Sequence, residues 1–213
     1  MNEQQQSLET LQDIKRMMER SSRFISLSGL SGISAGLCAL AGAWLVVGKL
    51  VSYKAAVQQT GDAVAARAVL IHELILIATV VFIAAFVSAF FFTYLRSKKS
   101  GIAVWGTASR RLMVNVAIPM AVGAIVIYRL LQLGQYELLS SSCLIFYGLA
   151  LVNASKYTLG EVRYLGYGQI ILGTINLWVA GYGLIFWATG FGFLHIVYGL
   201  LMWYKYERST SGK

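Results

Sequence analysis

Three amide side chains are candidates for a binding site because they lie at similar depth in three different apolar segments. These are Asn115, Asn153 and Gln169, and a polar link nearby carries Lys156, Glu161 and Arg163. Amides at this depth can line a pocket that opens to the cytoplasm and takes a small molecule or a lipid headgroup. Hydrogen bonds between helices, with a surface ion pair of Glu161 to Lys156 or Arg163, also explain the pattern. The sequence leaves both interpretations open.

His195 is the exception to a general absence of ionisable side chains deep in the apolar runs. It lies roughly 15 Å from the basic end of its segment at Lys205, at about 1.5 Å per residue. An imidazole can ligate haem or a metal, or transfer a proton. It can also simply hydrogen-bond a neighbouring helix, at Tyr198 or Asn176. Asn176 is a further candidate for a polar path through the membrane.

Motifs that carry enzymatic chemistry are missing from the chain. The sequence has no HExxH or P-loop, and no pair of acids within an apolar run. The absence of deep Asp, Glu, Lys and Arg also disfavours an ion-coupled transporter. Cys38 and Cys143 both fall in apolar segments and form no metal-binding pattern with histidine. We therefore predict no enzymatic activity, no catalytic residue, no metal site and no cofactor.

The elements that must position these residues are membrane helices. The chain is 57% hydrophobic and 13% charged, against about 25% charged in soluble domains. Its apolar runs are long enough to cross roughly 30 Å of hydrocarbon. We predict an all-α, polytopic membrane helix bundle over residues 23–206, a short amphipathic cytoplasmic helix at 1–22 and a cytoplasmic tail at 207–213. Six transmembrane helices are expected at 24–47, 69–95, 112–133, 138–157, 164–187 and 190–206.

Small residues recur at helical spacing in the first and fifth expected spans. The first carries Gly29, Gly32 and Gly36, and the fifth carries Gly166, Gly173 and Gly183. Such stripes let helix backbones approach closely in lipid. We expect the first span to pack on the fifth inside one bundle, and a homo-oligomer interface is the alternative. The last two spans are expected to turn through residues 188–190, and residues 48–68 to form the longest loop.

The distribution of basic residues predicts the orientation of the bundle. Of the 18 Lys and Arg residues, 14 fall on the side of the chain termini and 4 on the other. The positive-inside rule then places both termini in the cytoplasm. The net charge of +9 is thus explained by membrane insertion and not by nucleic-acid binding. The basic face would contact anionic lipid headgroups.

Two stretches carry a resemblance to a known group of proteins. KYTLGEVRYLGYG and GYGLIFWATGFGFLHIVYG are similar to sequences of uncharacterised six-span inner-membrane proteins from Bacteroidetes-type bacteria. The resemblance covers most of the chain. It implies a multi-pass protein of the bacterial inner membrane and implies no activity.

These observations favour a non-enzymatic membrane protein that acts through protein or lipid partners, as a self-associating subunit or as a sensor. The alternative is a channel or facilitator for a small uncharged or amphipathic solute. In that case Asn176 and Gln169 would line the path, and substituting them would change solute flux.

Overall fold

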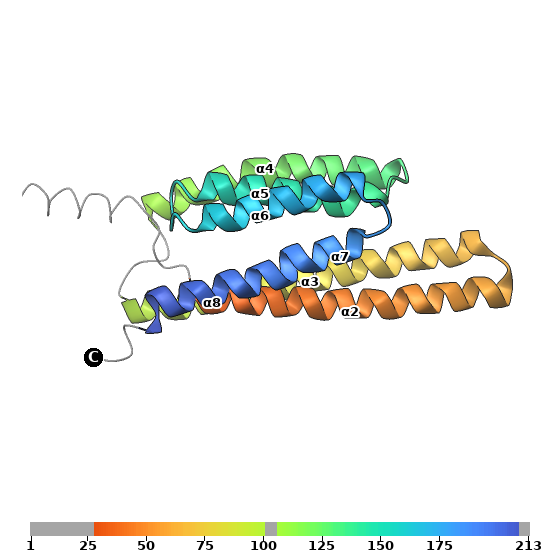
Figure 1. Ribbon diagram of the computed structural model, residues 1–213, viewed down its shortest axis with the longest axis horizontal. Coiled ribbons are helices and arrows are strands. Elements are labelled where there is room, and N and C mark those ends of the chain that lie inside the picture. Colours follow the sequence, from red (N-terminus) through yellow and green to blue (C-terminus); the bar gives the residue numbers. More distant parts are fainter. Residues whose placement is uncertain (1–27, 101–105, 209–213) are drawn as a thin grey trace, which may run out of the picture. The chain divides into compact units, whose positions relative to one another are not determined.

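The computed structural model describes residues 28–100 and 106–208, and every regular element in these ranges is helical (Figure 1). The elements are α2 (Gly29–Thr60), α3 (Ala63–Ser100), α4 (Thr107–Gln132), α5 (Glu137–Ala154), α6 (Val162–Trp178), α7 (Gly183–Trp187), the π-helix η1 (Ala188–Leu194) and α8 (His195–Tyr206). The predicted all-α class is confirmed. The amphipathic helix expected at 1–22 and most of the tail expected at 207–213 lie outside the described residues.

Five helical segments in the described part of the chain are long and apolar enough to cross a membrane. The continuous run α7–η1–α8 counts as one of them, spanning Gly183–Tyr206. The expected fifth span corresponds to α6, which has 17 residues and stands at the lower limit for a spanning helix. In contrast, α2 has 32 residues and α3 has 38. At about 1.5 Å per residue both exceed the roughly 30 Å hydrocarbon core, so they must tilt or extend beyond it.

The loop expected at residues 48–68 is almost entirely helical instead. Helix α2 continues to Thr60, and α3 begins at Ala63 after a turn of two residues. Gly61 adopts a left-handed conformation with φ 71° as the C-cap of α2. Asp62 then caps α3, because its Oδ1 accepts hydrogen bonds from the backbone N–H groups of Val64 and Ala65. A glycine C-cap followed directly by an aspartate cap makes a short helical hairpin possible.

The hairpin between the last two spans turns earlier than expected. Helix α6 ends at Trp178, and the chain reverses over residues 179–182 with Gly181 at φ 83°. Residues 188–190, which the sequence suggested as the turn, belong to the π-helix η1 inside a continuous helical run. The predicted bounds 164–187 and 190–206 are therefore wrong. Gly183 is the first residue of α7, so it does not continue the stripe of Gly166 and Gly173.

The helices form two compact units. One contains α4, α5 and most of α6. Helix α5 packs on α4, where a Cβ on Gly123 would lie 2.6 Å from Cβ of Phe146, and on α6 through Gly148 and Gly166. The pairs run antiparallel, as expected for helices joined by short links.

The second unit contains α2, most of α3, α7, η1 and α8. Helix α2 contacts α8 and η1 along one side. It meets α3 at Gly42, where an added Cβ would lie 2.5 Å from Cγ2 of Val81, and at the ion pair of Lys49 with Glu73. A further hydrogen bond links the N-terminal end of α2 to the residue after α8. There the carboxylate of Glu207 accepts from the backbone N–H of Gly29 at 2.6 Å.

The glycine stripes therefore have partners other than those expected. An added Cβ on Gly36 would lie 2.7 Å from the carbonyl oxygen of Gly192, and one on Gly32 would lie 3.2 Å from Cα of Gly199. Gly29 likewise approaches Gly199 and Trp203. The first span thus packs through its glycines on the last span. The glycines of the fifth expected span face α5 instead, so the two glycine stripes do not meet each other as expected.

In α6 the close approach is reciprocal. A Cβ on Gly166 would lie 2.8 Å from the carbonyl oxygen of Gly148, and one on Gly148 would lie 2.7 Å from that of Gly166. Gly173 approaches the backbone N–H of Ile145, with its added Cβ 3.0 Å from that nitrogen. Backbone contacts this short are open only to glycine, so these positions set the distance between α5 and α6.

Candidate functional site

Asn153 forms the hydrogen bond that links α5 to α4. Its side-chain Nδ2 donates to the backbone carbonyl oxygen of Asn115 at 2.9 Å. In a regular helix that carbonyl would accept from the N–H four residues later, which is position 119. Pro119 lies inside α4 and has no N–H to donate. The side chain of Asn153 thus supplies the donor that the proline cannot.

The three amides expected to form one pocket are divided between different contacts. The side chain of Asn115 turns back along its own helix and donates to the carbonyl oxygen of Arg111 at 2.8 Å. Gln169 is fully buried in the contact between α6 and α5, next to Gly148. Asn153, in contrast, faces a hollow on the surface of its unit.

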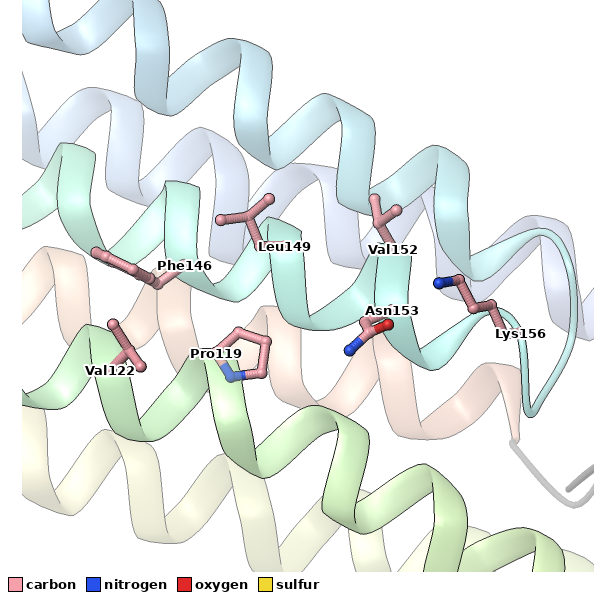
Figure 2. A pocket seen from close by; sticks show the side chains of 7 residues that line it. All are labelled: Pro119, Val122, Phe146, Leu149, Val152, Asn153 and Lys156. Carbon is pink, nitrogen blue, oxygen red and sulfur yellow. The ribbon is translucent and has the colours of Figure 1, made fainter.

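That hollow is a groove between α4 and α5 with a volume of about 410 Å³. It is lined by Pro119, Val122, Phe146, Leu149, Val152, Asn153 and Lys156 (Figure 2). We call it the Pro119 groove. The first five residues make its floor and walls apolar, and the two polar side chains stand together at one end. The groove has the size of a ligand site, and it is open along its length.

The basic end of the groove differs from the surface ion pair that was expected. Lys156 is exposed just after the C-cap of α5, and Figure 2 shows its amino group turned back over the groove toward Asn153. Arg163 makes its contact with Tyr164, and its guanidinium carbon lies 5.1 Å from the ring centre. Neither base lies within ion-pair distance of Glu161 among the described side chains.

His195 lies at the end of the π-helix and is buried. Its Nδ1 is 2.9 Å from the carbonyl oxygen of Gly190, five residues earlier. A carbonyl only accepts, so Nδ1 carries the proton in this contact. The imidazole also stacks on Phe191, with ring centres 6.0 Å apart and an angle of 17° between the planes. The histidine therefore has a structural contact within its own helix, where the sequence suggested Tyr198 or Asn176.

Asn176 lies in the last turn of α6 and hydrogen-bonds the turn that follows this helix. It is buried, and its Nδ2 donates to the carbonyl oxygen of Val179 in the following turn at 3.2 Å. Its Oδ1 has no hydrogen-bond partner within the described part of the chain. No group of three His, Cys, Asp or Glu side chains suited to a metal ion occurs in the described ranges.

Sequence reasoning identified Asn153 and Lys156 but missed the apolar residues that form the groove with them. The available signal was Pro119, because an internal proline leaves one carbonyl without its helical donor and prevents close packing along that face. Sequence reasoning also missed Gly148, Gly192 and Gly199, which are the partners of the predicted glycines in the helix contacts. Gly192 and Gly199 are seven residues apart, a spacing that places two residues on one helix face.

Comparison with known proteins adds no information on function. No protein-family model, no curated protein and no solved structure matches the chain.

Proposed function

We propose that this protein is a non-enzymatic, multi-pass membrane protein that acts through contacts with protein or lipid partners. The observation that carries the proposal is the surface of α3. Its most apolar 18-residue stretch has a mean hydropathy of 2.8 and not one buried residue. Large side chains such as Phe82, Ile83 and Phe86 are 55–65% exposed. An apolar helix surface of this extent in a membrane protein meets lipid tails or another membrane helix.

The use of the polar side chains also supports this proposal. Asn153, Asn176 and His195 each contact a backbone carbonyl oxygen, which is how polar groups stabilise helix packing in lipid. A transport path would instead need polar atoms that face a continuous cavity.

The location we propose is the inner membrane of a bacterium, with both termini in the cytoplasm. The excess of Lys and Arg on one side of the expected spans, 14 against 4, supports this orientation. The similarity of the KYTLGEVRYLGYG stretch to bacterial six-span proteins supports the compartment.

Native mass spectrometry of the protein extracted gently from its own membrane tests the proposal. We expect a defined homo-oligomer, a companion protein or a specifically bound lipid. The double variant Phe82→Ala/Phe86→Ala on α3 should weaken a protein contact. The matched control is Ile118→Ala/Ile125→Ala on α4, where the side chains are similarly exposed, at 59% and 69%. A bare monomer unaffected by either variant would contradict the proposal.

One observation favours the alternative of a solute facilitator. Asn176 is 3% exposed, and its Oδ1 has no partner within the described ranges, although a buried acceptor normally has one. A polar solute passing this point would supply a donor. Flux of small uncharged solutes into proteoliposomes that falls in Asn176→Leu would support the facilitator, and absence of flux in the wild type would exclude it.

A further inference from the structure

The Pro119 groove combines an apolar channel with a cation at one end. Its walls come from Pro119 and Val122 on α4 and from Phe146, Leu149 and Val152 on α5. Lys156 stands at the end where α5 finishes. Because α4 and α5 belong to one compact unit, the groove is complete within that unit.

The proline explains why the groove exists. Pro119 cannot donate the helical hydrogen bond to the carbonyl of Asn115, and that carbonyl accepts from Asn153 instead. Asn153 thereby spans the gap between the helices at the basic end. The remaining length of the groove stays open, and Val122 and Leu149 are 48% and 43% exposed along it.

The apolar lining of the groove extends over more than half the depth of one acyl layer. On α5 it runs from Phe146 to Val152, over which the helix rises about 9 Å at 1.5 Å per residue. Half of the hydrocarbon core of a bilayer is roughly 15 Å. Lys156 lies beyond Val152 at the same end of the groove, where the headgroup of a bound lipid would lie.

We infer that the Pro119 groove binds one anionic phospholipid, with an acyl chain along the apolar walls and the headgroup on Lys156. The ammonium group of a lysine binds phosphate as a point charge. No carboxylate of the described residues forms an ion pair with Lys156, so its charge is available to the lipid. This inference deepens the proposed function, because it rests on a membrane location and names one lipid partner and its site.

Arg163 provides a matched control for the charge. It is a second exposed base in the same short link region, but it lies over the ring of Tyr164 and does not line the groove. If Lys156 selects the headgroup by position, Lys156→Gln should change lipid selectivity and Arg163→Gln should not.

The experiment is native mass spectrometry of the purified full chain with an equimolar mixture of phosphatidylglycerol and phosphatidylethanolamine that carry identical acyl chains. The wild type should retain phosphatidylglycerol preferentially. Because one basic residue near an anionic surface contributes a factor of about five, Lys156→Gln should lower that preference by roughly fivefold. Equal effects of Lys156→Gln and Arg163→Gln would overturn the inference.

The apolar part of the groove is tested separately. Val122→Trp places an indole in the groove from a half-exposed position and should abolish retention of both lipids. Ile118→Trp enlarges an exposed side chain of the same helix outside the groove and should leave retention unchanged. Melting temperatures within a few degrees of the wild type show that each variant is folded.

Two outcomes would assign the groove differently and overturn the inference. One is unchanged lipid retention in Val122→Trp. The other is conversion of a dimer to a monomer by Val122→Trp at constant lipid count, which would make a second copy the occupant. Neither outcome affects the contact proposed for α3, because the Phe82→Ala/Phe86→Ala variant tests that surface independently.

Discussion

Substituting Asn153 should lower the free energy of unfolding by an amount that depends on the presence of Pro119. In Asn153→Leu the carbonyl oxygen of Asn115 loses the donor that now lies 2.9 Å away. A fully buried acceptor without a partner costs about 1–3 kcal/mol, whereas this one is part-buried, and hydrogen bonds between membrane helices contribute roughly 0.6–1.7 kcal/mol. We therefore expect the free energy of unfolding to fall by about 1–1.5 kcal/mol.

The decisive measurement is a double-mutant cycle with Pro119→Ala. Alanine restores the N–H of residue 119, which can then donate to the carbonyl of Asn115 within α4. In that background Asn153→Leu should cost less than about 0.5 kcal/mol, so the two substitutions should couple by roughly 1 kcal/mol. Reversible unfolding of the purified protein in mixed micelles, followed by circular dichroism, measures all four variants.

Asn115→Leu is the control for this cycle. The side chain of Asn115 bonds only within its own helix, to the carbonyl of Arg111, and the backbone acceptor survives the substitution. Its effect should be small and independent of Pro119. If Asn153→Leu costs the same in the wild type and in the Pro119→Ala background, the reasoning is refuted, because Asn153 would not be replacing the missing proline N–H.

Four further substitutions, of which Gly48→Ala is a control, test other contacts by the same unfolding measurement. Gly36→Ala should lower the free energy of unfolding by about 1–3 kcal/mol, because its Cβ would lie 2.7 Å from the carbonyl oxygen of Gly192. The control Gly48→Ala, with no atom within 4 Å of its Cβ, should instead stabilise α2 by up to about 1 kcal/mol. Equal effects of the two substitutions would contradict the packing. Glu207→Ala should cost about 1 kcal/mol through loss of the bond to the first N–H of α2, and no change would show that the cap is dispensable. Lys49→Gln should cost less than about 1 kcal/mol, since the 2.7 Å pair with Glu73 is 42% and 35% exposed, and a larger loss would mean that the pair is shielded from water.

The helical class was predictable because apolar runs of spanning length leave few other structures in lipid. The helix ends were less predictable. Residues 49–60 are polar enough to suggest a loop, but they contain no proline and no glycine, so α2 continues until Gly61. The pair Gly61-Asp62 does indicate the end of α2 and the start of α3, because glycine is typical of a C-cap and aspartate of an N-cap.

The partner of each helix face could not be predicted from spacing. Glycine stripes show that a close contact exists, but they do not say with which helix. Gly36 meets Gly192 and Gly166 meets Gly148 because of the tertiary arrangement. Residues 188–190, where the sequence suggested a turn, belong to a π-helix, and the turn lies at Gly181 instead, where φ is 83°.

Asn153 shows the same limit for the candidate site. Its type and depth in the apolar run made it a candidate both for a polar pocket and for a hydrogen bond between helices. That it bonds the carbonyl left by Pro119 depends on the register of α5 against α4, which single-sequence patterns do not contain. The groove beside it follows from that register too.

The contact between α2 and α8 has a consequence for the order of assembly during synthesis. Ser28 and Glu207, which are hydrogen-bonded at 3.1 Å, are 179 residues apart in the chain. At 5–20 residues per second, a ribosome needs roughly 10–40 s to reach Glu207 after it has made Ser28. During this interval α2 lies in the bilayer with its glycine face covered only by lipid, whereas α4, α5 and α6 follow one another directly and can associate as they emerge. Helix α2 is made before α3 to α8 and yet is among the last of these helices to gain its partner, so a nascent chain interrupted before α8 leaves that face open to insertases and membrane proteases.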